Sequence, residues 1–238
     1  MAAVVQRTEV ACRGGLRLRR KDLIFDFDGT LADTLPVIFR ASRQVFLTYL
    51  GESFDDDRIL QLFGPTEEAI LARMLPANHL SEGTALFYRL YEEGHERLAG
   101  QAAEMRSLLE RLRDEGFGMG VMTGKGERCA WISLRALGFS PYFPSVVTGN
   151  EIGRAKPDPE GILLVMRKMQ ATPASSLYIG DSQADVLAAR AAGIPVVGAQ
   201  WYTPQSATYE QQPDRAFFCL EDFRGWLLEE GEHVEQPL

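Results

Sequence analysis

Apolar and polar residues follow two different rhythms along this chain. The stretch Leu23–Phe27 is a short apolar run, typical of a buried strand, and it ends in Asp28-Gly29-Thr30. From about residue 36 to residue 98, apolar positions instead recur every three or four residues, as they do on the buried face of a helix. Gly64-Pro65 and Pro76-Ala77-Asn78 interrupt this region and predict breaks between helices.

Beyond about residue 100, short apolar runs alternate with helical stretches of about ten residues. The runs predicted as strands are 117–122, 146–148, 177–179, 195–197 and 216–219. The predicted helices are 105–113, 127–137, 161–169, 185–192 and 223–229. Strands separated by helices of this length indicate βα units around a parallel sheet.

The helical block between the first strand and the rest of the chain is too long to be a crossover connection alone. We therefore predict an α/β protein with a Rossmann-like, three-layer core, a parallel sheet and a small inserted helical cap domain. The core would comprise residues 21–35 and 101–238, and the cap residues 36–100. Residues 1–20, which hold five arginines and a single acidic residue, are expected to form a disordered basic tail.

Composition narrows the class of protein further. Of the 238 residues, 45% are hydrophobic and 24% are charged, which is typical of a globular chain and excludes disordered, collagen-like and disulfide-rich ones. The net charge of −8 disfavours nucleic acid or an anionic membrane as the main partner. Cys12, Cys129 and Cys219 form no CxxC pair, which suits a reducing cytoplasm, and no apolar run is long enough for a membrane helix.

Charged and hydroxyl side chains follow the predicted strands. Because ligands bind outside the carboxyl ends of parallel strands, we expect these side chains to meet at one edge of the sheet. They are Asp26 and Asp28 after the first strand, Thr123 after the second, Lys156 beyond the third, and Asp181 and Asp185 after the fourth.

Carboxylates that lie close together stay ionised only if a cation or hydrogen-bond donors neutralise them. A set of carboxylates without histidine or cysteine suits Mg²⁺, which binds one or two protein carboxylates together with water and phosphate. An aspartate left free to attack phosphorus would form an aspartyl-phosphate. Lys156 and the metal would then neutralise charge on the transferred phosphoryl group.

Four segments resemble the four motifs of the haloacid dehalogenase superfamily, in the same order. They are Asp26-Phe27-Asp28-Gly29-Thr30-Leu31, Thr123, Lys156-Pro157 and Gly180-Asp181-Ser182-x-x-Asp185. The resemblance covers residues 22–222. The insert after the first motif is similar to the helical cap of the phosphoglycolate phosphatase-like and β-phosphoglucomutase-like branch.

The resemblance implies a role for each motif residue. Asp26 would be the nucleophile, and Asp28 the acid and base that also binds Mg²⁺ through its backbone carbonyl. Asp26, Asp181 and Asp185 would complete the metal site, Asp181 directly and Asp185 either directly or through water. The implied phosphate-binding residues are Gly29, Thr30, Thr123, Gly124 and Lys156, of which Thr123 and Lys156 also count as catalytic. In this family an Asn commonly stands where Gly124 follows Thr123, so one side-chain contact to phosphate is absent here.

Several reactions of this superfamily are disfavoured by single residues. Asp28 argues against a dehalogenase, and the absence of lysine from residues 36–100 leaves no amine for a phosphonate hydrolase. Ile38 stands where related mutases carry a histidine. We therefore expect a Mg²⁺-dependent phosphatase for a small phosphate compound, which would be a monoester such as phosphoglycolate, a sugar phosphate or a nucleotide monophosphate, or else pyrophosphate. A β-phosphoglucomutase-like mutase and a catalytically idle binding or regulatory protein remain as alternatives.

Some features are left without a firm role. The loop 64–68 is the expected substrate-selecting segment, with Glu67 and Glu68 interpreted as helix N-terminal residues. Lys125 is interpreted as a solvated charge or one near the phosphate. Four cap arginines are candidates to bind an anionic substrate tail, although on a helical face such residues are more often solvated charges: Arg58, Arg73, Arg89 and Arg97. We expect a cytoplasmic monomer or homodimer with a small-molecule substrate and no nucleic-acid or membrane partner.

Overall fold

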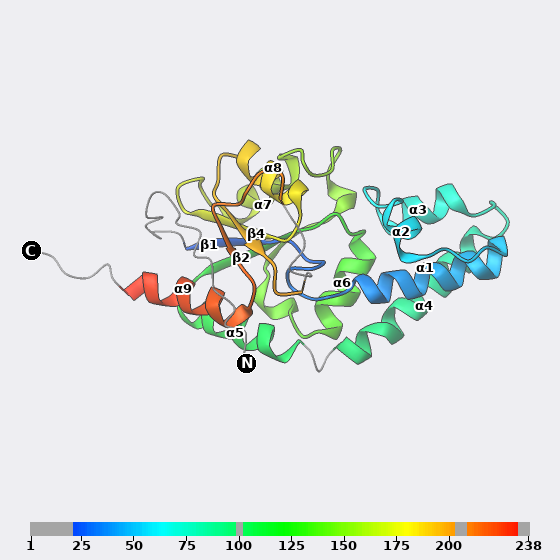
Figure 1. Ribbon diagram of the computed structural model, residues 1–238, viewed down its shortest axis with the longest axis horizontal. Helices are drawn as coiled ribbons and strands as arrows, with labels where there is room; N and C mark the ends of the chain where they lie inside the picture. Colours follow the sequence, from blue (N-terminus) through cyan, green and yellow to red (C-terminus); the bar gives the residue numbers. More distant parts are fainter. Residues whose placement is uncertain (1–20, 99–101, 203–208, 233–238) are drawn as a thin grey trace, which may run out of the picture.

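The computed structural model describes residues 21–98, 102–202 and 209–232; the predicted basic tail lies outside these residues. A six-stranded parallel sheet forms the centre of the larger part of the molecule, in the order β3-β2-β1-β4-β5-β6 (Figure 1). The strands are β1 (Asp22–Phe25), β2 (Gly118–Met122), β3 (Ser145–Val147), β4 (Ser176–Gly180), β5 (Val196–Ala199) and β6 (Arg215–Phe217).

Helices cover both faces of this sheet, because alternate residues of each strand point to opposite sides. Leu23 and Phe25 of β1 belong to the core cluster on one face, and Ile24 belongs to the cluster on the other. The first face is packed by α5 (Ala103–Asp114), α6 (Glu127–Ala136) and α9 (Leu220–Glu232). The second is packed by α7 (Glu160–Met169) and α8 (Gln183–Ala191). Two 3₁₀ turns flank β3, η1 (Ser140–Tyr142) and η2 (Gly149–Glu151).

The position of β1 brings distant sequence segments together. Asp22 pairs with Gly118 of β2 on one side and with Ser176 of β4 on the other, and the register continues to Phe25. Since all three strands run in parallel, the residues that follow them lie at one edge of the sheet. This is the edge at which the sequence predicts the chemistry.

Four helices form a separate body beside the sheet, at the right of Figure 1: α1 (Leu35–Leu50), α2 (Asp56–Leu60), α3 (Glu67–Met74) and α4 (Leu80–Leu98). They have their own apolar cluster, in which the rings of Phe46 and Phe54 contact each other at a tilt and Phe87 stacks against Tyr91. This packing is what an inserted cap domain over 36–100 requires, although the exact division stays a prediction. We refer to the four helices as the cap.

The predicted strands and helices occur in the predicted order, with differences at their ends. The last strand ends at Phe217, and α9 begins at Leu220 rather than at residue 223, since the Asp222 amide donates to the Cys219 sulfur in its first turn. None of the described helices combines the length and apolar character needed to cross a membrane.

Candidate active site

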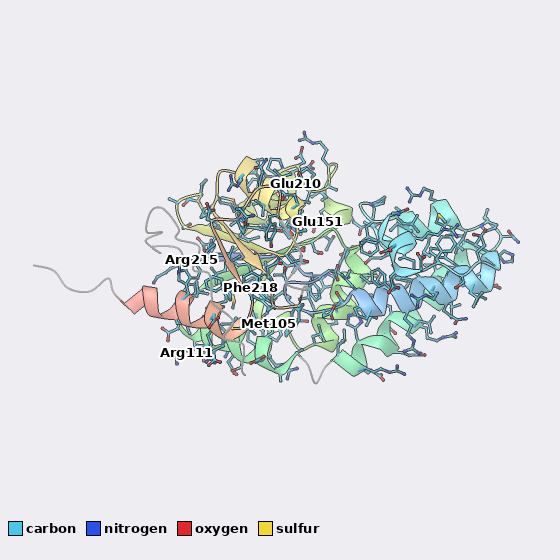
Figure 2. All side chains as sticks on the ribbon, in the orientation of Figure 1. Met105, Arg111, Glu151, Glu210, Arg215 and Phe218 are labelled. Atoms are coloured by element: carbon cyan, nitrogen blue, oxygen red, sulfur yellow. The ribbon has the colours of Figure 1, made fainter. Side chains whose placement is uncertain are left out.

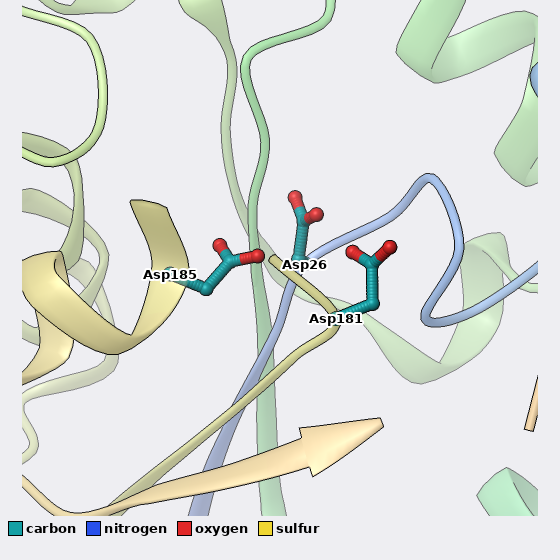
Figure 3. A group of neighbouring side chains, drawn as sticks. All are labelled: Asp26, Asp181 and Asp185. Carbon is teal, nitrogen blue, oxygen red and sulfur yellow. The ribbon is translucent and has the colours of Figure 1, made fainter. Parts of the chain in front are cut away.

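Three carboxylates meet at the carboxyl edge of the sheet. Asp26 directly follows β1, Asp181 directly follows β4, and Asp185 lies in the first turn of α8. One oxygen from each lies within 4.8 Å of the others, and the close-up in Figure 3 shows them grouped where the two strands end. Asp26 and Asp185 are buried, and Asp181 is partly buried. The structure thus brings together three of the four predicted metal-binding residues through their side chains.

Asp185 is held on all sides by donors. One of its oxygens accepts from Lys156 Nζ at 2.6 Å and from the Tyr178 hydroxyl at 2.9 Å. The other accepts from the Ser182 amide at 3.0 Å and hydroxyl at 2.6 Å, as part of a capping box that starts α8. Burial alone would raise the pKa of Asp185, but Lys156 and these hydrogen bonds outweigh it and lower that pKa.

Lys156 joins two of the acids. Its Nζ lies 2.8 Å from an oxygen of Asp26 and 2.6 Å from Asp185. Burial would lower the pKa of the Lys156 ammonium, but the two carboxylates raise it well above its usual value. Lys156 is therefore a permanent positive charge beside Asp26, as the sequence predicts.

At Asp26 and Asp181, the cost of burying a negative charge is offset less than it is at Asp185. Burial, partly offset by Lys156, raises the pKa of Asp26 to about 7, and burial and the charge of Asp26 raise the pKa of Asp181 to about 8. These two carboxyl groups therefore resist ionisation. A bound cation would lower their pKa values, because its positive charge favours the ionised forms. The donor set is oxygen alone, so the residues present fit Mg²⁺.

Two glycines allow this close approach. Gly29 has a φ of +76°, and a Cβ on it would lie 2.3 Å from Asp181 Oδ2. A Cβ on Gly180 would lie 2.5 Å from Asp185 Cγ. Any larger residue would have to displace an acid of the group, which explains why glycines precede or follow the acids in two of the motifs. Thr30, the next residue of the first motif, is fully buried, and its hydroxyl has no partner within the described residues.

The Asp28 carboxylate lies outside the group of three acids. It forms an ion pair with Lys125 Nζ at 2.7 and 2.9 Å, and it also accepts a hydrogen bond from the Thr34 hydroxyl. The predicted metal contact through the Asp28 backbone carbonyl stays a prediction. Lys125 is 3% exposed, so of its two interpretations the solvated charge is wrong, and the charge near the phosphate stays a prediction. The position of Lys125, two residues after Thr123, was the sequence signal that it lies in the site.

Thr123 and Gly124 lie at the end of β2 as predicted. Thr123 is buried, and its Oγ1 accepts from the Lys125 amide at 3.2 Å. A Cβ on Gly124 would meet nothing within 4 Å, so the position of the family's usual Asn is open space. Both residues line a cavity of about 330 Å³ that also contains Asp26, Asp28 and Lys156 on its walls.

The cap contributes one acidic residue to this cavity. Glu67, in the first turn of α3, accepts from the Gly126 amide at 2.6 Å and lies 3.7 Å from Lys125 Nζ. Burial raises the pKa of Glu67, whereas Lys125 and the amide oppose that rise. The interpretation of Glu67 as a helix N-terminal residue is correct but incomplete, because it also binds the cap to the core. Sequence spacing gives no sign of this contact between segments 59 residues apart.

The structure does not support a contact between the four cap arginines and an anionic substrate tail. Arg58 pairs with Glu52 at 2.9 Å, and its guanidinium lies 3.4 Å from the centre of the Phe54 ring. The other three, Arg73, Arg89 and Arg97, are exposed, and none of the four lines the cavity.

A parallel α/β core has an aspartate, a lysine and a group of carboxylates that could hold a cation at one edge, beside a helical cap. This arrangement fits a hydrolase of phosphate esters. The chain belongs to the haloacid dehalogenase-like hydrolase family, whose model matches residues 23–199. The sequence-based resemblance to this superfamily, and the predicted α/β fold, are therefore confirmed.

Relatives of known sequence and structure support this family assignment. The phosphoglycolate phosphatase of Pseudomonas fluorescens is 32% identical over 226 residues, which cover 90% of this chain and 82% of that protein. Pyrophosphatase PpaX of Bacillus pumilus is 28% identical, with coverage of 81% and 89%. A crystal structure of a predicted phosphoglycolate phosphatase from Haemophilus somnus has the same fold, with a TM-score of 0.71, 23% identity and coverage of 88% and 97%. These relatives confirm the prediction that the enzyme class is phosphatase.

Proposed function

We propose that this protein is a Mg²⁺-dependent phosphatase that hydrolyses a small phosphate monoester through an aspartyl-phosphate on Asp26. The family and its phosphatase relatives support hydrolysis of small phosphate esters. The contact between Lys156 and both Asp26 and Asp185 carries the assignment of the nucleophile, since it places a fixed positive charge where a phosphoryl group would be transferred.

In the first half-reaction, a carboxylate oxygen of Asp26 attacks phosphorus and the bond from phosphorus to the alcohol oxygen breaks. Asp28 donates a proton to the departing alkoxide. In the second half-reaction, Asp28 takes a proton from water, which attacks the aspartyl-phosphate and releases inorganic phosphate and free Asp26. Lys156 and the Thr123 hydroxyl bind the phosphoryl oxygens in both steps.

Asp26, Asp181 and Asp185 would hold the metal ion, together with the Asp28 backbone carbonyl. When bound, Mg²⁺ supplies positive charge that offsets the phosphoryl oxygens. Ser182 and Tyr178 keep Asp185 oriented, so that one of its oxygens stays beside Lys156 and Asp26.

The first experiment compares hydrolysis of p-nitrophenyl phosphate by the wild type and by Asp26→Asn, each with Mg²⁺ and with excess chelator. We expect turnover only in the wild type with Mg²⁺, because an amide is a poor nucleophile. Asp22→Asn is the matched control, since Asp22 begins the same strand at its opposite end. Full activity in Asp26→Asn would overturn the assignment of the nucleophile.

Trapping tests the intermediate itself. Beryllium fluoride with Mg²⁺ should form an adduct on Asp26, visible as a rise in melting temperature of the wild type and of Asp22→Asn but not of Asp26→Asn. A mutase would instead interconvert sugar phosphates with little release of phosphate, and no observation on this structure favours it. The cytoplasmic location, the absence of a nucleic-acid partner and the oligomeric state stay predictions.

A further inference from the structure

The cavity at the active site has two chemically different ends. At the sheet edge, its walls are the acids and lysines described above. Toward the cap, its walls are mostly apolar side chains from α1, α2, α3, α4 and the loop between α2 and α3, and the polar side chains there are Ser42 and Glu67. We call six of these the cap wall: Ile38, Phe46, Leu60, Leu62, Phe63 and Ile70.

Positive charge is confined to the sheet end. Among the described residues that line the cavity, the cations are Lys125 and Lys156. Each already contacts two carboxylates, Asp28 and Glu67 for Lys125 and Asp26 and Asp185 for Lys156. A second anionic group on the substrate would therefore lie against the cap wall without a partner, and burying such a group is unfavourable.

Part of the cap wall is exposed to solvent although it is apolar. Leu60 is 49% exposed and Phe63 is 36% exposed, and both lie on the cavity that contains the catalytic acids. Phe218, which is more exposed, lies over the sheet-containing part of the molecule and away from the cap (Figure 2). Exposed apolar side chains that line a cavity beside reactive groups are typical of a surface covered by a bound ligand.

We infer that the cap wall binds the alcohol part of the substrate, and that this part is uncharged and apolar. The inference rests on the phosphatase function proposed above. The preferred substrates would be monoesters of small aliphatic or aromatic alcohols, not phosphorylated carboxylates or inorganic pyrophosphate. The cavity, at about 330 Å³, lies at the small end of the range for ligand sites, which is roughly 300–1,000 Å³.

The test compares kcat/KM for pairs of esters that share a shape, measured by released inorganic phosphate with Mg²⁺ present. Isobutyl phosphate and phosphoglycolate form one pair, because the planar carboxylate of phosphoglycolate takes the place of the isopropyl group, with its two oxygens where the two methyl groups would be. We expect isobutyl phosphate to be preferred by at least about tenfold, from the cost of burying an unpaired charge. Among ethyl, propyl and butyl phosphate, kcat/KM should rise by about fourfold per methylene, the factor for burying one CH₂ group.

A charge placed in the cap wall should reverse the preference. Leu60→Arg adds a cation at the far end of the cavity, and the ratio of kcat/KM for phosphoglycolate to that for isobutyl phosphate should rise by about tenfold or more. Leu47→Arg is the matched control, because Leu47 is 47% exposed but does not line the cavity, and its ratio should equal that of the wild type. Melting temperatures of both variants show that each is folded.

The outcomes separate the two proposals. Turnover of p-nitrophenyl phosphate together with a preference for phosphoglycolate or pyrophosphate would overturn the inference and leave the phosphatase function standing. An unchanged ratio in Leu60→Arg would also overturn it. Absence of turnover for every ester would overturn the phosphatase function and the inference with it.

Discussion

Replacing Asp181 by asparagine removes one negative charge from the group of three acids, and it should stabilise the metal-free protein. The pKa of Asp181 is raised from 3.8 to about 8 by burial and by the neighbouring carboxylates. The folded chain therefore keeps a proton on this group between about pH 4 and pH 8, where the unfolded chain has lost it. The contribution of Asp181 to the stability of the metal-free wild type must then fall as the pH rises through this window.

The magnitude follows from the same pKa shift. At about 1.4 kcal/mol for each pKa unit, the gap between 3.8 and about 8 sets an upper limit of roughly 6 kcal/mol well above pH 8, and of roughly 5 kcal/mol at pH 8 itself, where the group is half ionised. The buried amide of asparagine has its own cost of about 1–3 kcal/mol. We expect a net gain of about 2–4 kcal/mol at pH 8, or roughly 5–10 °C in melting temperature for a chain of this size. At pH 5 the gain should nearly vanish.

Thermal unfolding in chelator and in Mg²⁺, at pH 5 and pH 8, measures both effects. Mg²⁺ should raise the melting temperature of the wild type at pH 8 and have a much smaller effect on Asp181→Asn. Asp22→Asn, at the other end of β1, should behave as the wild type does. If Asp181→Asn melted below the wild type in chelator at pH 8, or kept the full Mg²⁺ response, the explanation of the site as a repulsive cluster that accepts a cation would be wrong.

Three further substitutions test the surroundings of the site. Lys125→Met should lower the free energy of unfolding by about 3–5 kcal/mol in urea titration, since the buried Glu67 and the partly buried Asp28 lose their cation. Lys168→Met at an exposed ion pair should cost less than about 1 kcal/mol. Glu67→Gln keeps the side-chain shape but loses the pair with Lys125, so its loss should be smaller than that of Lys125→Met in the same titration. Gly29→Ala should reduce kcat by at least about 100-fold, the scale of losing one preorganised group, because its Cβ would collide with Asp181. A kcat near that of the wild type would show that Asp181 can move without loss of activity.

Most of the fold was predictable because the signals were local. Apolar runs bounded by glycine and proline mark each strand, and the order of strands and helices dictates a parallel sheet. The meeting of Asp26, Asp181 and Lys156 was predictable for the same reason, since residues that follow parallel strands gather at one edge. The ends of helices were less predictable, because they depend on caps such as the one formed by Ser182 and Asp185.

The contacts between the cap and the core were not predictable from the sequence. The burial of Lys125 depends on where Glu67 arrives from the cap, and neither residue lies in a periodic pattern that fixes its partner. The cap arginines were harder to assign from the sequence. Their charge made them candidates to bind an anion, but a helix can direct a long side chain to solvent as easily as to a cavity, and solvated charge was the commoner expectation. Arg58 is paired with Glu52 and does not line the cavity.

The position of Lys125 links the cap to the chemistry. Its ammonium lies between Asp28, which is proposed to transfer the proton, and Glu67, which reaches the core from α3. Because Glu67 also accepts from the Gly126 amide, any movement of α3 away from the core would remove a negative charge from beside Lys125 and expose the carboxylates to water. Asp28 therefore has both Lys125 and Glu67 near it only when the cap is packed against the core. The same movement would open the cap wall, so binding of an apolar alcohol group and assembly of the acid–base residue would depend on one contact.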